Sequence, residues 1–112
     1  MGAFTDDELN LVYDASLEFG SDWRRPVAQL AAERLPGRSP EFYESIALAV
    51  ASCRSEVESH VAHEHRRLQG TWTSRDEVAV DEWLSERFPW MSRRNRRRGL
   101  RQGQYYAHHD GW

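Results

Sequence analysis

The pattern that most constrains the fold is a long series of apolar residues at helical spacing between Ser39 and Gly70. Ser39 followed by Pro40 is typical of a helix start, because proline fits the first helical turn, where no intrahelical N–H bond is lost. A glycine just after the last apolar residue of such a series favours a helix end, so Gly70 predicts that this helix stops at about Leu68. Its apolar stripe consists of Phe42, Ile46, Val50, Cys53, Val57, Val61 and Leu68. We therefore expect a long third helix as the central element of the fold.

Two shorter helices are expected before the long one. The first begins with a capping box, a pattern in which a threonine and a glutamate three residues later bond each other's backbone N–H groups. The second contains a proline that is tolerated only because it lies in the first turn. The bounding signals are Thr5 with Glu8 and Gly20 for the first helix, and Ser21 or Asp22, Pro26 and Pro36-Gly37 for the second.

Two further helices are expected after the long one. Ser74 with Glu77 matches a second capping box and predicts the start of a fourth helix. Ser92 is expected to cap a fifth helix that runs to about Gly103, since serine is a preferred residue at this position. Residues 104–112 show no helical periodicity, so we expect them to form an aromatic tail docked on the bundle.

These signals together predict an all-α fold, a compact bundle of about five helices in a single domain covering residues 1–112. No run of residues alternates between apolar and polar as a strand would. The one cysteine, Cys53, cannot form an internal disulfide. The longest apolar run, Ile46 to Ala51, is far too short to span a membrane. We therefore expect a cytoplasmic protein without a membrane-spanning segment.

Charge is distributed unevenly along the chain. Residues 1–88 contain 9 arginines and 17 acidic residues, a net charge of −8, whereas residues 89–112 contain 6 arginines and one aspartate, a net charge of +5. The six arginines lie between Arg93 and Arg101. Like charges four residues apart repel each other on a helix. An anionic group is therefore expected beside this segment.

Negative charge beside this segment has two candidate sources. One is the protein itself, because the acidic helix 75–88 directly precedes the arginines and could pair with them in antiparallel fashion. The other is an external partner, either nucleic acid or an acidic protein. Arginine and asparagine are the side chains that read guanine and adenine edges. The candidate contact residues on this helix are Arg93, Arg94, Asn95, Arg97, Arg98 and Arg101.

Histidines near the end of the long helix suggest a metal site. Glu56, His60 and His63 fall within an arc of about 60° and so share one face, whereas His65 lies about 140° from His60. Imidazole and carboxylate groups are ligands for transition metals such as zinc. The alternative is that His60 borders the apolar stripe and that the other histidines are exposed.

Glu64 falls near the middle of the apolar stripe, between Val57 and Leu68. A carboxylate in this position must either pair with a cation or reach water, because burying an unpaired charge is strongly unfavourable. We expect Glu64 to pair with a nearby arginine such as Arg67 or Arg87.

The end of the chain is rich in aromatic residues. Residues 104–112 include Tyr105, Tyr106 and Trp112, and this composition is too apolar for a disordered tail. We expect the tail to dock on its own domain, on a second copy or on a partner. The five tryptophans of the chain are interpreted either as wedges between helices or as part of a partner surface, where Trp, Tyr and Arg are enriched.

No catalytic signature is found, since the chain has no glycine-rich phosphate loop, no nucleophile elbow and no cysteine pair. An enzyme is therefore not expected. The leading hypothesis is a non-catalytic interaction module without a cofactor, a monomer or homodimer that contacts an acidic protein or nucleic acid through residues 92–103 and the aromatic tail. The alternatives are a nucleic-acid-binding regulator that uses the arginine helix and a metal-binding protein built on His60 and His63.

Overall fold

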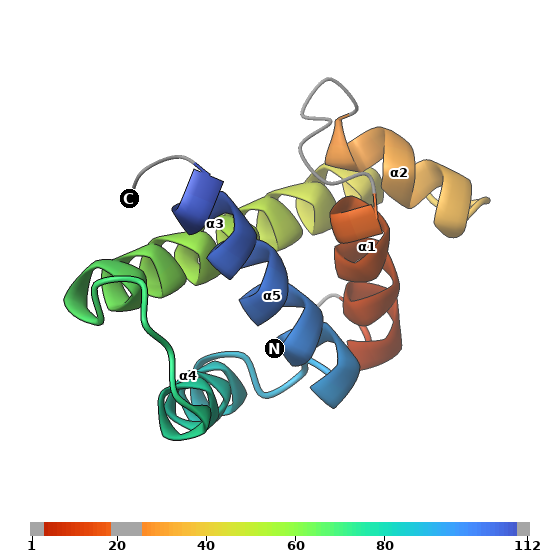
Figure 1. Cartoon of the computed structure of the whole chain (residues 1–112). Helices are drawn as coiled ribbons and strands as arrows, with labels where there is room; N and C mark the ends of the chain where they lie inside the picture. Colours follow the sequence, from red (N-terminus) through yellow and green to blue (C-terminus); the bar gives the residue numbers. More distant parts are fainter. Residues whose placement is uncertain (1–3, 19–25, 110–112) are drawn as a thin grey trace.

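A computed structural model of the protein describes residues 4–18 and 26–109. This part of the chain forms five helices and no strand, which confirms the predicted all-α bundle (Figure 1). The helices are α1 (Asp6–Glu18), α2 (Val27–Arg34), α3 (Pro40–Arg67), α4 (Ser74–Arg87) and α5 (Arg93–His109). The expected helix boundary at Gly20, Ser21 and Asp22 lies outside the described residues. The expectation that Pro26 lies in the first turn of the second helix is wrong, because Pro26 is the non-helical N-cap and α2 begins at Val27.

Side-chain caps explain where the first and third helices begin. The backbone N–H of Thr5 donates to Glu8 Oε1 at 2.9 Å, and the N–H of Glu8 donates to Thr5 Oγ1 at 3.1 Å, so the first capping box is confirmed. At α3, the N–H of Phe42 donates to Ser39 Oγ at 3.1 Å, with Pro40 in the first turn. Each cap satisfies an N–H group that has no partner within its helix.

The second capping box lies one residue earlier than expected. The Thr73 side chain accepts from the Asp76 N–H at 3.2 Å, and Asp76 Oδ2 accepts from the Thr73 N–H at 2.9 Å. Thr73 is extended, with φ −104° and ψ 165°, whereas Ser74 is already helical. The prediction of Ser74 with Glu77 is therefore wrong, because two overlapping frames fit the same pattern and the backbone adopts the earlier one. Glu77 is thereby left available for contacts with α5.

Helix α3 is the central element, as predicted. Helices α1 and α2 pack near its start, and α5 crosses it between α4 and α1 (Figure 1). The pairing of α5 with α3 is the most extensive in the fold. Of the expected stripe on α3, the five residues from Ile46 to Val61 are buried. The core residues packed around this stripe are Val12, Tyr13, Leu17, Ala31, Val80, Leu84, Phe88, Met91 and Leu100.

Glu64 lies at the border of this core and pairs as predicted. Its Oε1 accepts from Arg67 Nη2 at 2.7 Å, and the bond from the guanidinium lowers the pKa of the Glu64 carboxyl. Arg87, the other expected partner, instead pairs with Glu56 at 2.8 Å. Across the described parts of the chain, no helix is both long and apolar enough to cross a bilayer.

Candidate functional site

Helix α5 carries most of the candidate contact residues, and it is longer than expected. It runs from Arg93 to His109, so residues 104–109 continue the helix instead of forming a non-helical tail. Its start is as predicted, because the Asn95 N–H donates to Ser92 Oγ at 3.1 Å. The expected end at Gly103 is wrong, because this glycine lies in the helix interior, where a neighbouring helix approaches it closely.

One face of α5 is buried although it contains almost no large apolar residue. Residues 95, 99, 103 and 107, four positions apart, are all buried, together with Leu100. A Cβ atom at Gly99 would lie 2.6 Å from Tyr13 Oη on α1. A Cβ atom at Gly103 would lie 2.9 Å from Val61 Cβ on α3. Close approach of the α5 backbone to its neighbours thus holds the helix in place.

Asn95 belongs to this buried face and not to the contact surface. It is only 2% exposed, and its Nδ2 donates to the backbone oxygen of Asn10 at 3.0 Å and to Asn10 Oδ1 at 2.9 Å. Asn10 in turn donates to the Trp90 carbonyl at 2.7 Å and accepts from the Ser92 N–H at 2.8 Å. The prediction that Asn95 contacts nucleic acid is therefore wrong. Its role is to join α1 to the start of α5.

The acidic helix α4 pairs with part of the arginine helix, as one of the two interpretations predicted. Arg96 Nε lies 2.9 Å from Asp81 Oδ1, and Arg101 Nη1 lies 2.6 Å from Glu77 Oε2. Hydrogen bonds from Gln104 and from Arg101 lower the pKa of the Glu77 carboxyl. This pairing offsets part of the repulsion among the arginines.

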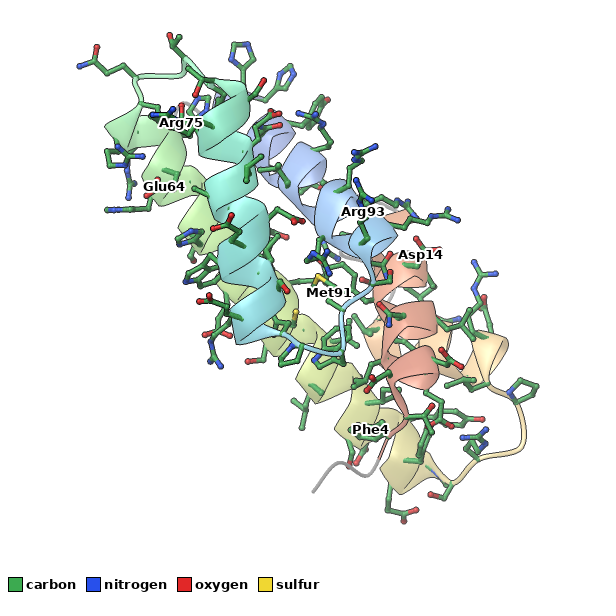
Figure 2. The ribbon with its side chains drawn as sticks, turned by 90° about the horizontal axis from the view of Figure 1, so that it is seen from below. Phe4, Asp14, Glu64, Arg75, Met91 and Arg93 are labelled. Carbon is green, nitrogen blue, oxygen red and sulfur yellow. The ribbon has the colours of Figure 1, made fainter. Side chains whose placement is uncertain are left out.

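A second acidic partner comes from α1 and was not predicted. Arg98 forms an ion pair with Asp14, and Arg94 Nη2 lies 4.0 Å from the same carboxylate. Figure 2 shows Asp14 on α1 beside the start of α5, where Arg93 lies. Among the described residues, neither Arg93 nor Arg97 has a carboxylate within ion-pair distance. Helix α5 therefore keeps uncompensated positive charge.

The exposed side of α5 presents a continuous row of side chains, which we call the α5 outer face. The row follows helical intervals of three and four residues, opposite the buried small residues. Side-chain exposure is 75% for Arg94, and Tyr105 is 59% exposed. The residues of the α5 outer face are Arg94, Arg97, Arg101, Tyr105 and His108.

A hollow of about 610 Å³ lies beside the α5 outer face, and we call it the arginine hollow. Leu17 contributes one wall from α1, and all other described lining residues come from α5. They are Arg97, Arg98, Arg101, Gln102, Tyr105 and Tyr106. Three arginine side chains and two tyrosine side chains therefore line one open space.

The residues of the expected metal site are engaged elsewhere. The His60 ring stacks on Trp83 with the ring centroids 3.8 Å apart and the planes 6° from parallel. Glu56 pairs with Arg87, and His63 is exposed. Within residues 4–18 and 26–109, no three His, Cys, Asp or Glu side chains gather as metal ligands would.

His65 is buried, whereas the alternative to the metal site had all histidines except His60 exposed. Its Nδ1 accepts a hydrogen bond from Trp72 Nε1 at 3.1 Å. The imidazole therefore links the last turn of α3 to the segment that follows it. Trp72, Trp83 and Trp90 are half-buried against the core, which agrees with their interpretation as wedges between helices. Two other tryptophans, at positions 23 and 112, lie outside the described residues.

The stacked His60 should make stability depend on pH. Burial lowers the pKa of His60 from its ordinary value of 6.5. The unfolded chain then binds a proton more readily than the folded chain, so the contribution of His60 is complete above about pH 6.5 and is lost as the pH falls below it. We expect the melting temperature to decrease between about pH 7.5 and about pH 5.5. His60→Phe, which keeps a ring on Trp83, should show a smaller decrease, whereas His63→Gln should behave like the wild type.

Of the residues expected to contact a partner, the structure places Arg93, Arg94, Arg97, Arg101 and Tyr105 on the surface of α5. Two more, at positions 98 and 106, are half-buried beside them, and position 112 lies outside the described residues. Comparison with protein-family models, with curated proteins and with solved structures found no match to this chain.

Proposed function

We propose that the protein is a non-catalytic binding module that holds an anionic partner against the α5 outer face. The observation that carries this proposal is the division of α5 into two faces. One face is fixed by close backbone contact with α1 and α3, and the other presents exposed arginines and a tyrosine. Arginine and tyrosine are among the residues that contribute most to binding interfaces.

The charges on α5 favour an anionic partner. Arg93 and Arg97 have no carboxylate partner among the described residues, and Arg94 lies only at the limit of ion-pair distance from Asp14. Arg93 and Arg97 are four residues apart, so they repel each other until an anion lies between them. Hydrogen bonds between guanidinium groups and carboxylate or phosphate are short and strong, and they are frequently bidentate.

Rigidity of α5 supports the same function. Gly99 and Gly103 hold the backbone against neighbouring helices, and Asn95 joins it to α1. Ion pairs with Asp14 and Glu77 restrict the guanidinium groups of Arg98 and Arg101. A surface that is already ordered loses less conformational entropy when it binds.

Charge reversal on the α5 outer face tests this function. Two fluorescent probes would be used, a 12-nucleotide single-stranded DNA and a 12-residue glutamate peptide, with anisotropy measured at low and high salt. We expect at least one probe to bind, more weakly at high salt. Arg97→Glu should weaken that binding at least about ten-fold, because it replaces an attraction by a repulsion.

Arg75→Glu is the matched control for this experiment. It makes the same change of charge on an exposed residue in the first turn of α4, and Arg75 lies well apart from Arg93 (Figure 2). Its loss of affinity at high salt should be much smaller than that of Arg97→Glu, because Arg75 is not part of the α5 outer face and salt screens its exposed charge. Equal losses in both variants, or the absence of binding to either probe, would contradict the proposed function.

A further inference from the structure

We propose that the anionic partner is single-stranded nucleic acid, with one nucleotide in the arginine hollow and the strand following the α5 outer face. This inference rests on the proposed function and specifies its partner. It depends on three features of the described residues: the guanidinium groups of the hollow, the exposed ring of Tyr105 and the carboxylates along both edges of α5.

The guanidinium groups of the arginine hollow suit a phosphate. Arg97, Arg98 and Arg101 line the same space. Arg97 has no ion-pair partner among the described residues, and the other two use only some of their donors on Asp14 and Glu77. A guanidinium group carries five N–H donors in a planar fork that matches the oxygens of a phosphate. The paired carboxylates therefore orient two of the guanidinium groups while donors remain for a ligand.

The ring of Tyr105 suits a nucleobase. It is 59% exposed and lines the same hollow as the three arginines. The His109 ring lies 4.2 Å from it between centroids, and the Tyr106 ring contacts it edge-on at 5.9 Å, so its position is supported within α5. Bases of single strands stack on such aromatic rings next to basic side chains. A glutamate peptide has no aromatic ring that could stack on Tyr105, whereas every nucleotide carries one, and this difference favours nucleic acid.

The carboxylates along α5 favour a single strand over a duplex. Helix α5 lies between α4 and α1, with Glu77 and Asp81 along one edge and Asp14 along the other. A helix in the major groove has a phosphate strand on each side, and here both strands would lie over carboxylates. A single strand can follow the row from Arg94 to Tyr105, about 16 Å at 1.5 Å per residue, without crossing either edge.

The test is fluorescence anisotropy with the full chain at low salt, with a 12-nucleotide oligothymidine as the single-stranded DNA probe. Tyr105→Ala should weaken binding about ten-fold to 100-fold, because it removes the stacking surface for one base. Tyr105→Phe keeps the ring and should bind within about two-fold of the wild type. The glutamate peptide, the corresponding duplex and a nucleoside monophosphate should each bind at least about ten-fold more weakly than the single strand. Melting temperatures of all variants establish that they are folded.

Several results would overturn this inference. One is that Tyr105→Ala binds the single strand as tightly as the wild type does. Another is that the duplex or the mononucleotide binds as tightly as the single strand. A third is that only the glutamate peptide binds. In the last case, loss of peptide binding in Arg97→Glu would leave the proposed function standing with a protein partner. Absence of binding to every probe would overturn the proposed function as well.

Discussion

Gly103→Ala should destabilise the protein by about 2 kcal/mol, although alanine normally stabilises a helix interior by about 1 kcal/mol relative to glycine. The reason is the close approach of α5 to α3. A Cβ atom at position 103 would lie 2.9, 3.0 and 3.1 Å from Cβ, Cγ1 and Cγ2 of Val61, and these carbons are all close to the α3 backbone. The two helices must therefore separate to accommodate a methyl group. We expect the melting temperature to decrease by about 8 °C, and by more in Gly103→Leu.

A double-mutant cycle with Val61→Ala provides the control. Val61→Ala alone should destabilise the protein, because it removes two buried methyl groups. In combination with Gly103→Ala, the total loss should be smaller than the sum of the two single losses, since removing the two γ carbons of Val61 relieves two of the three close contacts, while the contact with its Cβ remains. If thermal or urea unfolding shows that the two losses in the free energy of unfolding add strictly, the contact between Gly103 and Val61 does not limit the approach of the helices.

Asn95→Asp is the second substitution with a large expected effect, a loss of about 3 kcal/mol or more in the free energy of unfolding at neutral pH. The side-chain nitrogen of Asn95 donates to two oxygen atoms of Asn10 in a site that is 2% exposed. The substitution replaces this donor by a charged acceptor, so oxygen faces oxygen without a proton between them. An unpaired buried charge of this kind is among the strongest single destabilising changes.

The pH dependence of this variant identifies the cause. Burial and the two facing oxygens should raise the pKa of the new carboxyl above that of an unfolded aspartate. The folded state then binds the proton more tightly, so part of the lost stability should return as the pH falls toward about 5. Asn95→Ala, which has no charge, should be destabilised without this recovery. Urea unfolding at neutral pH and at about pH 5 distinguishes the two variants. An equal loss of stability in Asn95→Asp at both pH values would contradict this account.

The starts of α1, α3 and α5 were the part of the fold best predicted from the sequence, because their signals are local. Thr5 with Glu8, Ser39 with Pro40, and Ser92 each act within one helical turn. The error at α4 has the same origin. Thr73 and Ser74 both begin the capping pattern, and the sequence alone does not determine which of them adopts the extended backbone.

The packing of α5 was not predicted, because the usual signal of a buried face is a stripe of large apolar residues. Here the buried face consists of Asn95, Gly99, Gly103 and Ala107, and a glycine was interpreted as a helix end. The regular four-residue spacing of small residues was the available signal. The pairing of Asp14 with Arg98 had no local signal, because the two residues are 84 positions apart.

The order of the helices along the chain has a consequence for synthesis on the ribosome. Helix α5 follows every segment on which it packs, and it covers the part of α3 that contains Val57 and Val61. Translation adds about 5–20 residues per second, so the apolar stripe of α3 emerges seconds before the helix that covers it. During this interval the nascent chain exposes a surface of the kind that chaperones recognise. Completion of the fold thus depends on its most highly charged segment, which is also the last of the described helices to be made.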